Sequence, residues 1–111
     1  MKTRYVTEMG MGTDVHGGDY TQAAERAVFD AIHHSSLHFF APLGKTADDM
    51  FIDLLIGVPE PDKVDAEKVA AALPYGTVNI TVQKGGLEIP ADDGNDAIII
   101  ANAGIVVRLA D

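Results

Sequence analysis

The chain has 111 residues, of which 47% are hydrophobic and 23% charged, a balance typical of one globular domain over residues 1–111. Its formal net charge of −9 and its 8 scattered Lys and Arg residues would repel a phosphate polymer, so we expect no nucleic-acid partner. Without Cys, a signal-peptide pattern or an apolar run of about 20 residues, the sequence predicts a cytoplasmic protein with no membrane partner.

The first predicted elements are a strand over Thr3–Met9, which is rich in β-branched and aromatic residues, and a helix that begins after Asp19. The segment Gly10–Asp19 between them holds four glycines, two aspartates and a histidine, a composition that predicts a glycine-rich loop. Asp19 and Gln22 have the spacing of a helix-capping box. The apolar stripe of the helix comprises Ala23, Ala24, Ala27, Val28, Ala31 and Ile32.

The remaining elements follow from apolar runs bounded by Gly and Pro. They are a loop over residues 36–49, a strand over Met50–Val58, a short helix over Asp65–Leu73 with Asp65 as N-cap, a strand over Thr77–Gln83 that turns at Gly85-Gly86, a turn over Asp92–Asp96 and a strand over Ala97–Leu109. This β-α-β-α-β-β order predicts an α+β sandwich, a mixed four-stranded sheet with two helices on one face.

Both faces of the predicted sheet are apolar, because the strands Met50–Val58 and Ala97–Leu109 alternate between two sets of apolar side chains. Two helices cover one face, so the other face needs a partner, and a homo-oligomer is one solution. Ala101, Ala103 and Gly104 would allow a close approach of two sheets. The alternative cover is the loop over residues 36–49.

The pattern Gly10-x-Gly12-x-Asp14-x-His16-Gly17 resembles the signature GxGxDxHG of a small family of conserved hypothetical proteins in bacteria and plants. The resemblance extends through most of the chain and includes Ala23–Ile32, Ile56–Pro59, Leu73–Gly76 and Ile100–Ala103. It implies kinship with proteins that have no assigned reaction.

Asp14-Val15-His16 is also similar, more weakly, to the Gly-x-Asp-x-His segment of 2-C-methyl-D-erythritol 2,4-cyclodiphosphate synthase, whose Asp and His hold zinc. Asp30-Ala31 matches a second segment of that enzyme, but Arg26 stands where the enzyme has its third ligand, a His. The similarity therefore implies only a fold, the chorismate-mutase-like sandwich that often forms trimers with sites between subunits.

Asp14 and His16 are the candidate catalytic residues and candidate metal ligands, because side chains two residues apart on an extended chain point the same way. A divalent metal such as zinc needs about three protein ligands, and the candidates for the third are Asp19, His33, His34 and His38. For the last three, the favourable interaction of histidine with the dipole at the end of a helix is the simpler explanation. Without a metal, His16 would act as a general acid–base that Asp14 orients.

Free N–H groups at a glycine turn before a helix suit an anionic or polar ligand. The candidate ligand-binding residues are Gly10, Gly12, Gly17, Asp19, Arg26 and Asp30. Structural alternatives are Asx turns for the aspartates and a solvated pair of Arg26 with Asp30. Asp53, in an apolar strand, also needs a partner, which Arg4 or Arg108 can supply.

These observations lead to three hypotheses of function. The first is a small oligomeric enzyme that acts on a polar or anionic small molecule, with its site in the Gly10–Asp19 loop. The second is a non-catalytic metabolite- or metal-binding protein that uses the same loop. The third is a structural or partner-binding subunit that docks through the apolar face of its sheet.

Overall fold

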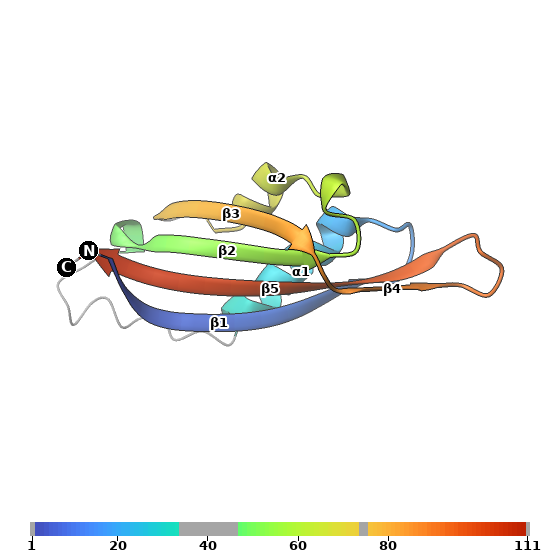
Figure 1. Cartoon of the computed structure of the whole chain (residues 1–111), viewed down its shortest axis with the longest axis horizontal. Helices are drawn as coiled ribbons and strands as arrows, with labels where there is room; N and C mark the ends of the chain where they lie inside the picture. The colour runs from blue at the N-terminus through green and yellow to red at the C-terminus, as the bar shows by residue number, and fades with distance from the viewer. Residues whose placement is uncertain (1, 34–46, 74–75, 111) are drawn as a thin grey trace.

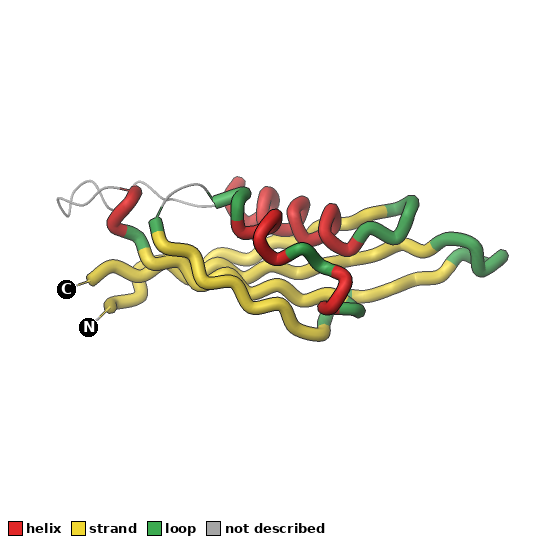
Figure 2. The backbone as a smooth tube through the Cα atoms, turned by 90° about the horizontal axis from the view of Figure 1, so that it is seen from above, coloured by secondary structure: helices red, strands yellow, loops and turns green. Residues whose placement is uncertain are grey.

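The computed structural model describes residues 2–33, 47–73 and 76–110. It consists of one mixed β-sheet with helices against one face (Figures 1 and 2). Its elements are β1 (Lys2–Asp14), α1 (Tyr20–His33), η2 (Ala47–Asp49), β2 (Phe51–Val58), η3 (Pro61–Lys63), α2 (Ala66–Ala70), β3 (Thr77–Lys84), β4 (Leu87–Pro90) and β5 (Ala97–Ala110). The predicted α+β class is confirmed, but the sheet has five strands where the sequence predicts four.

The strand order is β1-β5-β2-β3, and β4 pairs with β5 off this path. Strand β5 is antiparallel to β1, β2 and β4, whereas β2 and β3 are parallel and are joined by a crossover through η3 and α2. The predicted turn at Gly85-Gly86 does not fold the chain back on β3. Gly86, at φ 63°, lies beside the carbonyl of Ile100. The chain that follows it forms β4, which pairs with β5.

Strand β1 continues to Asp14, so the prediction that the strand ends at Met9 is wrong. Gly10 and Gly12 lie inside the strand and face α1. A Cβ atom on Gly12 would lie 2.6 Å from the carbonyl carbon of Arg26, and one on Gly10 would lie 2.9 Å from Cα of Ala31. These two glycines allow the helix to rest directly on the strand. Only the last part of the predicted glycine loop, residues 15–19, is a loop.

The core lies between the helices and the sheet. The alanine-rich stripe of α1 is buried, as its spacing predicts, together with apolar side chains of β2 and β5. Ala101 and Ala103 belong to this helix-facing side, which corrects their predicted place in a contact between two sheets. Asp65 is confirmed as an N-cap, because its Oδ1 accepts the Lys68 N–H at 3.2 Å.

In the part of the chain that the structure describes, no helix packs against the opposite face of the sheet (Figure 2). Most of the loop predicted as its alternative cover, residues 36–46, lies outside the described residues, as do His34 and His38. Among the described helices, none is long and apolar enough to span a membrane.

Candidate functional site

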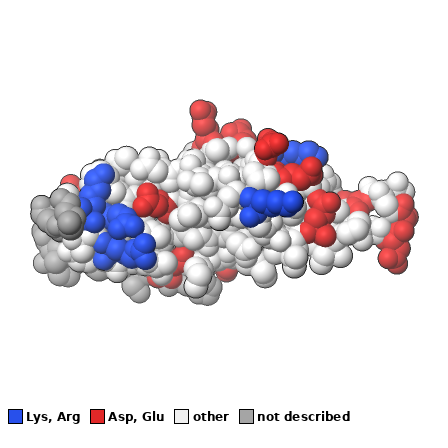
Figure 3. Space-filling model, in the orientation of Figure 1, with Lys and Arg blue, Asp and Glu red and all other residues white. Residues whose placement is uncertain are grey.

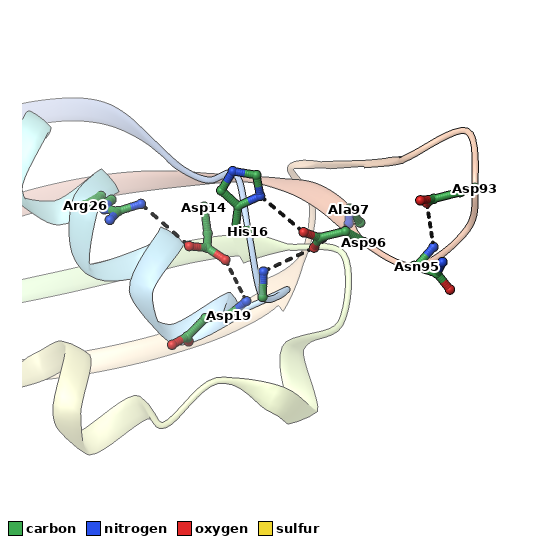
Figure 4. A network of polar contacts seen from close by, with 9 residues as sticks. Asp14, His16, Asp19, Arg26, Asp93, Asn95, Asp96 and Ala97 are labelled. Atoms are coloured by element: carbon green, nitrogen blue, oxygen red, sulfur yellow. Dashed lines mark hydrogen bonds and ion pairs between the residues drawn. The ribbon is translucent and has the colours of Figure 1, made fainter.

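Asp14 joins the end of β1 to the start of α1 (Figure 4). Asp14 is 4% exposed. Its Oδ2 accepts the Asp19 N–H at 2.9 Å, and its Oδ1 lies 3.7 Å from Nη1 of Arg26. Asp19 in turn caps the helix, because its Oδ1 accepts the Gln22 N–H at 3.0 Å. The predicted cap at Asp19 is confirmed, and Asp14 holds the backbone that leads into it.

His16 lies on the solvent side of the loop, where its side chain is 87% exposed and its Nδ1 is 3.2 Å from Oδ2 of Asp96 (Figure 4). Asp96 Oδ1 also accepts the N–H groups of Ala97 at 2.8 Å and Gly17 at 3.1 Å. The hydrogen bonds from Ala97, His16 and Gly17 lower the pKa of the Asp96 carboxyl. The carboxylate that orients His16 is therefore Asp96 and not the predicted Asp14, because β1 ends at Asp14 and the alternation of side chains ends with it.

The predicted metal site gains no third ligand in residues 2–33, 47–73 and 76–110, where no three His, Cys, Asp or Glu side chains form a group that could hold a metal ion. Asp19 is occupied as a helix cap. His33 lies at the far end of α1, with its ring centroid 4.3 Å from that of Phe29. The other candidates, His34 and His38, lie outside the described residues.

Arg26 and Asp30, predicted to bind a ligand, reach from α1 to the free edge of β1. The Met11 N–H donates to Oδ2 of Asp30 at 3.0 Å, and Nη1 of Arg26 donates to the Thr13 carbonyl at 2.6 Å. An edge strand has unpaired backbone groups, and these two side chains satisfy some of them. Together with the packing of Gly10 and Gly12, this edge contact gives four of the predicted ligand-binding residues a structural role.

A hollow of about 510 Å³ opens beside the residue 15–19 loop, where the start of α1, η3 and the β4–β5 hairpin meet. Gly17, one of the predicted site residues, lines this hollow together with its neighbour Gly18. Both glycines have a positive φ, and the space at their missing side chains is open. The polar side chains that line the hollow are Tyr20, Glu60, Lys63, Glu88, Asn95 and Asp96.

Tyr20 is 7% exposed and carries its hydroxyl into this hollow between two carboxylates. The hydroxyl donates to Oε2 of Glu60 at 2.6 Å and also contacts Oε1 of Glu88. Nζ of Lys63 lies 3.1 Å from the same Glu60 oxygen. A phenol has one proton, so at any moment it donates to one carboxylate and leaves the other to solvent or to a donor from a ligand.

The same contacts control the pKa values. Hydrogen bonds to Glu60 and Glu88, followed by burial, raise the pKa of the Tyr20 hydroxyl well above its ordinary value of 10.0. The hydrogen bond from Tyr20, followed by that from Lys63, lowers the pKa of Glu60. The sequence predicts no functional role for these four residues, because they come from α1, from η3 and the residue before it, and from β4, and show no local motif.

We expect Tyr20 to remain a neutral phenol in alkaline solution at pH values where an ordinary tyrosine ionises. Because the folded protein holds this proton more tightly than the unfolded chain, the contribution of Tyr20 to stability is full below pH 10.0 and is lost as the pH rises above it. Ultraviolet titration of the phenolate, compared between wild type and Tyr20→Phe, measures this. A Tyr20 phenolate that forms with an ordinary pKa in the folded protein would contradict the geometry.

Two comparisons with known proteins, one with family profiles and one with solved structures, found a match that covers most of the chain. A family profile described as conserved hypothetical protein (Lin0512_fam) matches residues 4–107. The crystal structure of an FtsZ-like protein of unknown function from Nostoc punctiforme is similar, with 36% sequence identity, a TM-score of 0.89 and coverage of 99% of this chain and 98% of that chain. None of the curated proteins compared with the chain matches it.

Proposed function

Because the chain belongs to the family of conserved hypothetical proteins (Lin0512_fam), whose description names no activity, we propose its function from the chemistry of the hollow around Tyr20. The predicted kinship with such a family is confirmed. The proposal is that the hollow binds a small polar molecule with a positively charged group that donates hydrogen bonds, such as an amine or a guanidinium.

The position of the Tyr20 hydroxyl between Glu60 and Glu88 is the observation that carries this proposal. A cation with N–H groups would replace solvent as the donor to the carboxylate that the single phenol proton does not satisfy. Among residues 2–33, 47–73 and 76–110, Lys63 forms an ion pair with Glu60 at 3.1 Å and no Lys or Arg pairs with Glu88, so the charge of Glu88 is left for a ligand to neutralise.

The charges around the hollow support a cation over the anion that was one of the predicted ligand types. Three carboxylates line it, from Glu60, Glu88 and Asp96, against one ammonium group, from Lys63. A phosphate or carboxylate ligand would meet net repulsion there. The predicted loop contributes Gly17 and Gly18 to the proposed site. The space where their side chains would be is empty, so a ligand can approach the backbone there.

A matched pair of probes tests this function: 1,4-diaminobutane and succinate, which have the same carbon chain and opposite charges. We expect the diamine to raise the melting temperature, by roughly 10 °C at one hundred times its Kd. Succinate should leave it unchanged. Glu88→Gln should abolish the shift, and Asp62→Asn, a charge removed from η3 outside the hollow, should preserve it. Stabilisation by succinate, or an undiminished shift in Glu88→Gln, would refute the proposal.

A catalytic use of the same hollow is the second candidate, favoured by the groups for proton transfer beside it. The Tyr20 hydroxyl contacts two carboxylates, and the imidazole of His16 contacts Asp96, which lines the hollow. Nuclear magnetic resonance of a mixture of small metabolites incubated with the chain distinguishes the two functions. New signals that fail to form with Tyr20→Phe would support an enzyme, and bound but unchanged metabolites would support binding alone.

A further inference from the structure

The face of the sheet opposite α1, which we call the open face, exposes large apolar side chains along most of its length. Met9 is 76% exposed and Met11 is 55% exposed, although both lie in regular strand next to β5. The strand register places further exposed apolar residues on the same face, namely Leu55, Leu87, Ile89 and Ile98. Contiguous apolar surface of this kind marks an interaction site.

The open face has the size of a standard protein–protein interface. Strands β1 and β5 have 13 and 14 residues, and β2 and β3 have 8 each. At about 3.3 Å per residue and about 4.8 Å between strands, these four strands have a footprint of roughly 700 Å². A stable complex buries about 800 Å² on each partner, so a second molecule of similar size would cover the face.

Charges of opposite sign stand at the two ends of the open face. In the view of Figure 3, in which α1 lies behind the sheet, Lys and Arg gather where β1 begins and Asp and Glu occupy the opposite tip. The register places Arg4 beside Arg108 at the basic end, where Arg108 also binds Asp53 at 3.2 Å, as the sequence predicts. The acidic tip carries Asp92 and Asp93 in the turn between β4 and β5.

We propose that the open face binds a second copy of the chain, as a two-fold dimer in which the strands of the two sheets run in opposite directions. A two-fold axis across the strands places the basic end of each copy on the acidic tip of the other. An axis along the strands would instead bring like charges together. The distribution of charge therefore selects a self-complementary partner and its orientation.

The relief of the open face fits the same partner. A hollow of about 380 Å³ lies between Met9 and Leu55 and has Gly57 and Gly104 among its lining residues. Protruding methionine side chains beside a hollow lined by glycine provide both the knob and the hole that a two-fold contact requires. Of the small residues predicted to permit close approach of two sheets, Gly104 has this position.

Native mass spectrometry and sedimentation equilibrium of the full chain test the proposal, with twice the 11.8 kDa chain mass as the expected result. Met9→Glu places a charge on the open face and should weaken the dimer at least about one-hundredfold. Phe29→Glu, at a position on α1 that is 62% exposed, is the matched control and should leave the dimer intact. Because both positions are exposed, circular dichroism should show folded protein in each case.

Charge reversal tests the orientation. Arg4→Glu and Asp93→Lys should each dissociate into monomers more readily than wild type, whereas an equimolar mixture of the two variants should form heterodimers, because both of its end contacts then pair opposite charges. A monomer at every concentration, a trimer, or a Met9→Glu dimer as tight as wild type would overturn the proposal. Failure of the mixed variants to associate would overturn the antiparallel arrangement.

Discussion

Replacing Gly12 with alanine is expected to lower the free energy of unfolding by about 3 kcal/mol and the melting temperature by roughly 12 °C. The added methyl group would lie 2.6 Å from the Arg26 carbonyl carbon and closer still to the backbone of Ala23 and Ala27. These are backbone atoms of α1, so no side-chain rotation relieves the clash. The helix must move away from β1 and expose the alanine stripe that it buries.

The matched control is Gly104→Ala, which adds the same methyl group to a strand glycine on the open face. Its nearest neighbour within the chain would be Cβ of Leu55 at 4.0 Å, an ordinary contact, so in a Met9→Glu background that keeps the chain monomeric we expect a change in the free energy of unfolding below about 0.5 kcal/mol. Chemical denaturation of Met9→Glu with and without each glycine substitution measures both changes. Equal stability of Gly12→Ala and wild type would show that α1 does not rest on β1 as described.

The sequence could predict most of the fold because the long helix and the longer strands are recognisable from local patterns. The alanine stripe, the cap at Asp19 and the long apolar β5 needed no knowledge of the rest of the chain. The extent of β1 was missed because glycine is typical of loops. A different signal was present: Gly10, Gly12 and Asp14 alternate with Met9, Met11 and Thr13, the period of a strand with one face against a helix.

The candidate site depended on contacts between distant segments, which no local pattern can predict. The carboxylate that holds His16 is 80 residues away, and Glu88 is 68 residues from the Tyr20 hydroxyl that it contacts. The first contact follows from the pairing of β1 with β5, and the second from the pairing of β4 with β5, whereas the sequence predicts only that the third strand turns at Gly85-Gly86 into Leu87–Ile89. The pairing of β4 thus decides which side chains surround the hollow.

Asp14 provides the second large effect, because its carboxylate is buried and holds the entry to α1. We expect Asp14→Ala to lower the free energy of unfolding by about 3 kcal/mol. The loss leaves the Asp19 N–H without its acceptor at 2.9 Å and removes the negative charge beside Arg26. Asp14→Asn keeps an acceptor oxygen and fills the same volume, so it should recover about half of this loss.

His16→Ala distinguishes this structural role from the predicted catalytic pair. The imidazole is 87% exposed, so its removal should change the free energy of unfolding by less than about 0.5 kcal/mol, unlike Asp14→Ala. If Asp14 and His16 instead formed one metal site, elemental mass spectrometry would find zinc in the wild type and none in either variant, and both would lose stability together. Different effects on stability, without bound zinc, would assign Asp14 to the start of α1 and leave His16, held by Asp96, as the group free to exchange protons with a ligand.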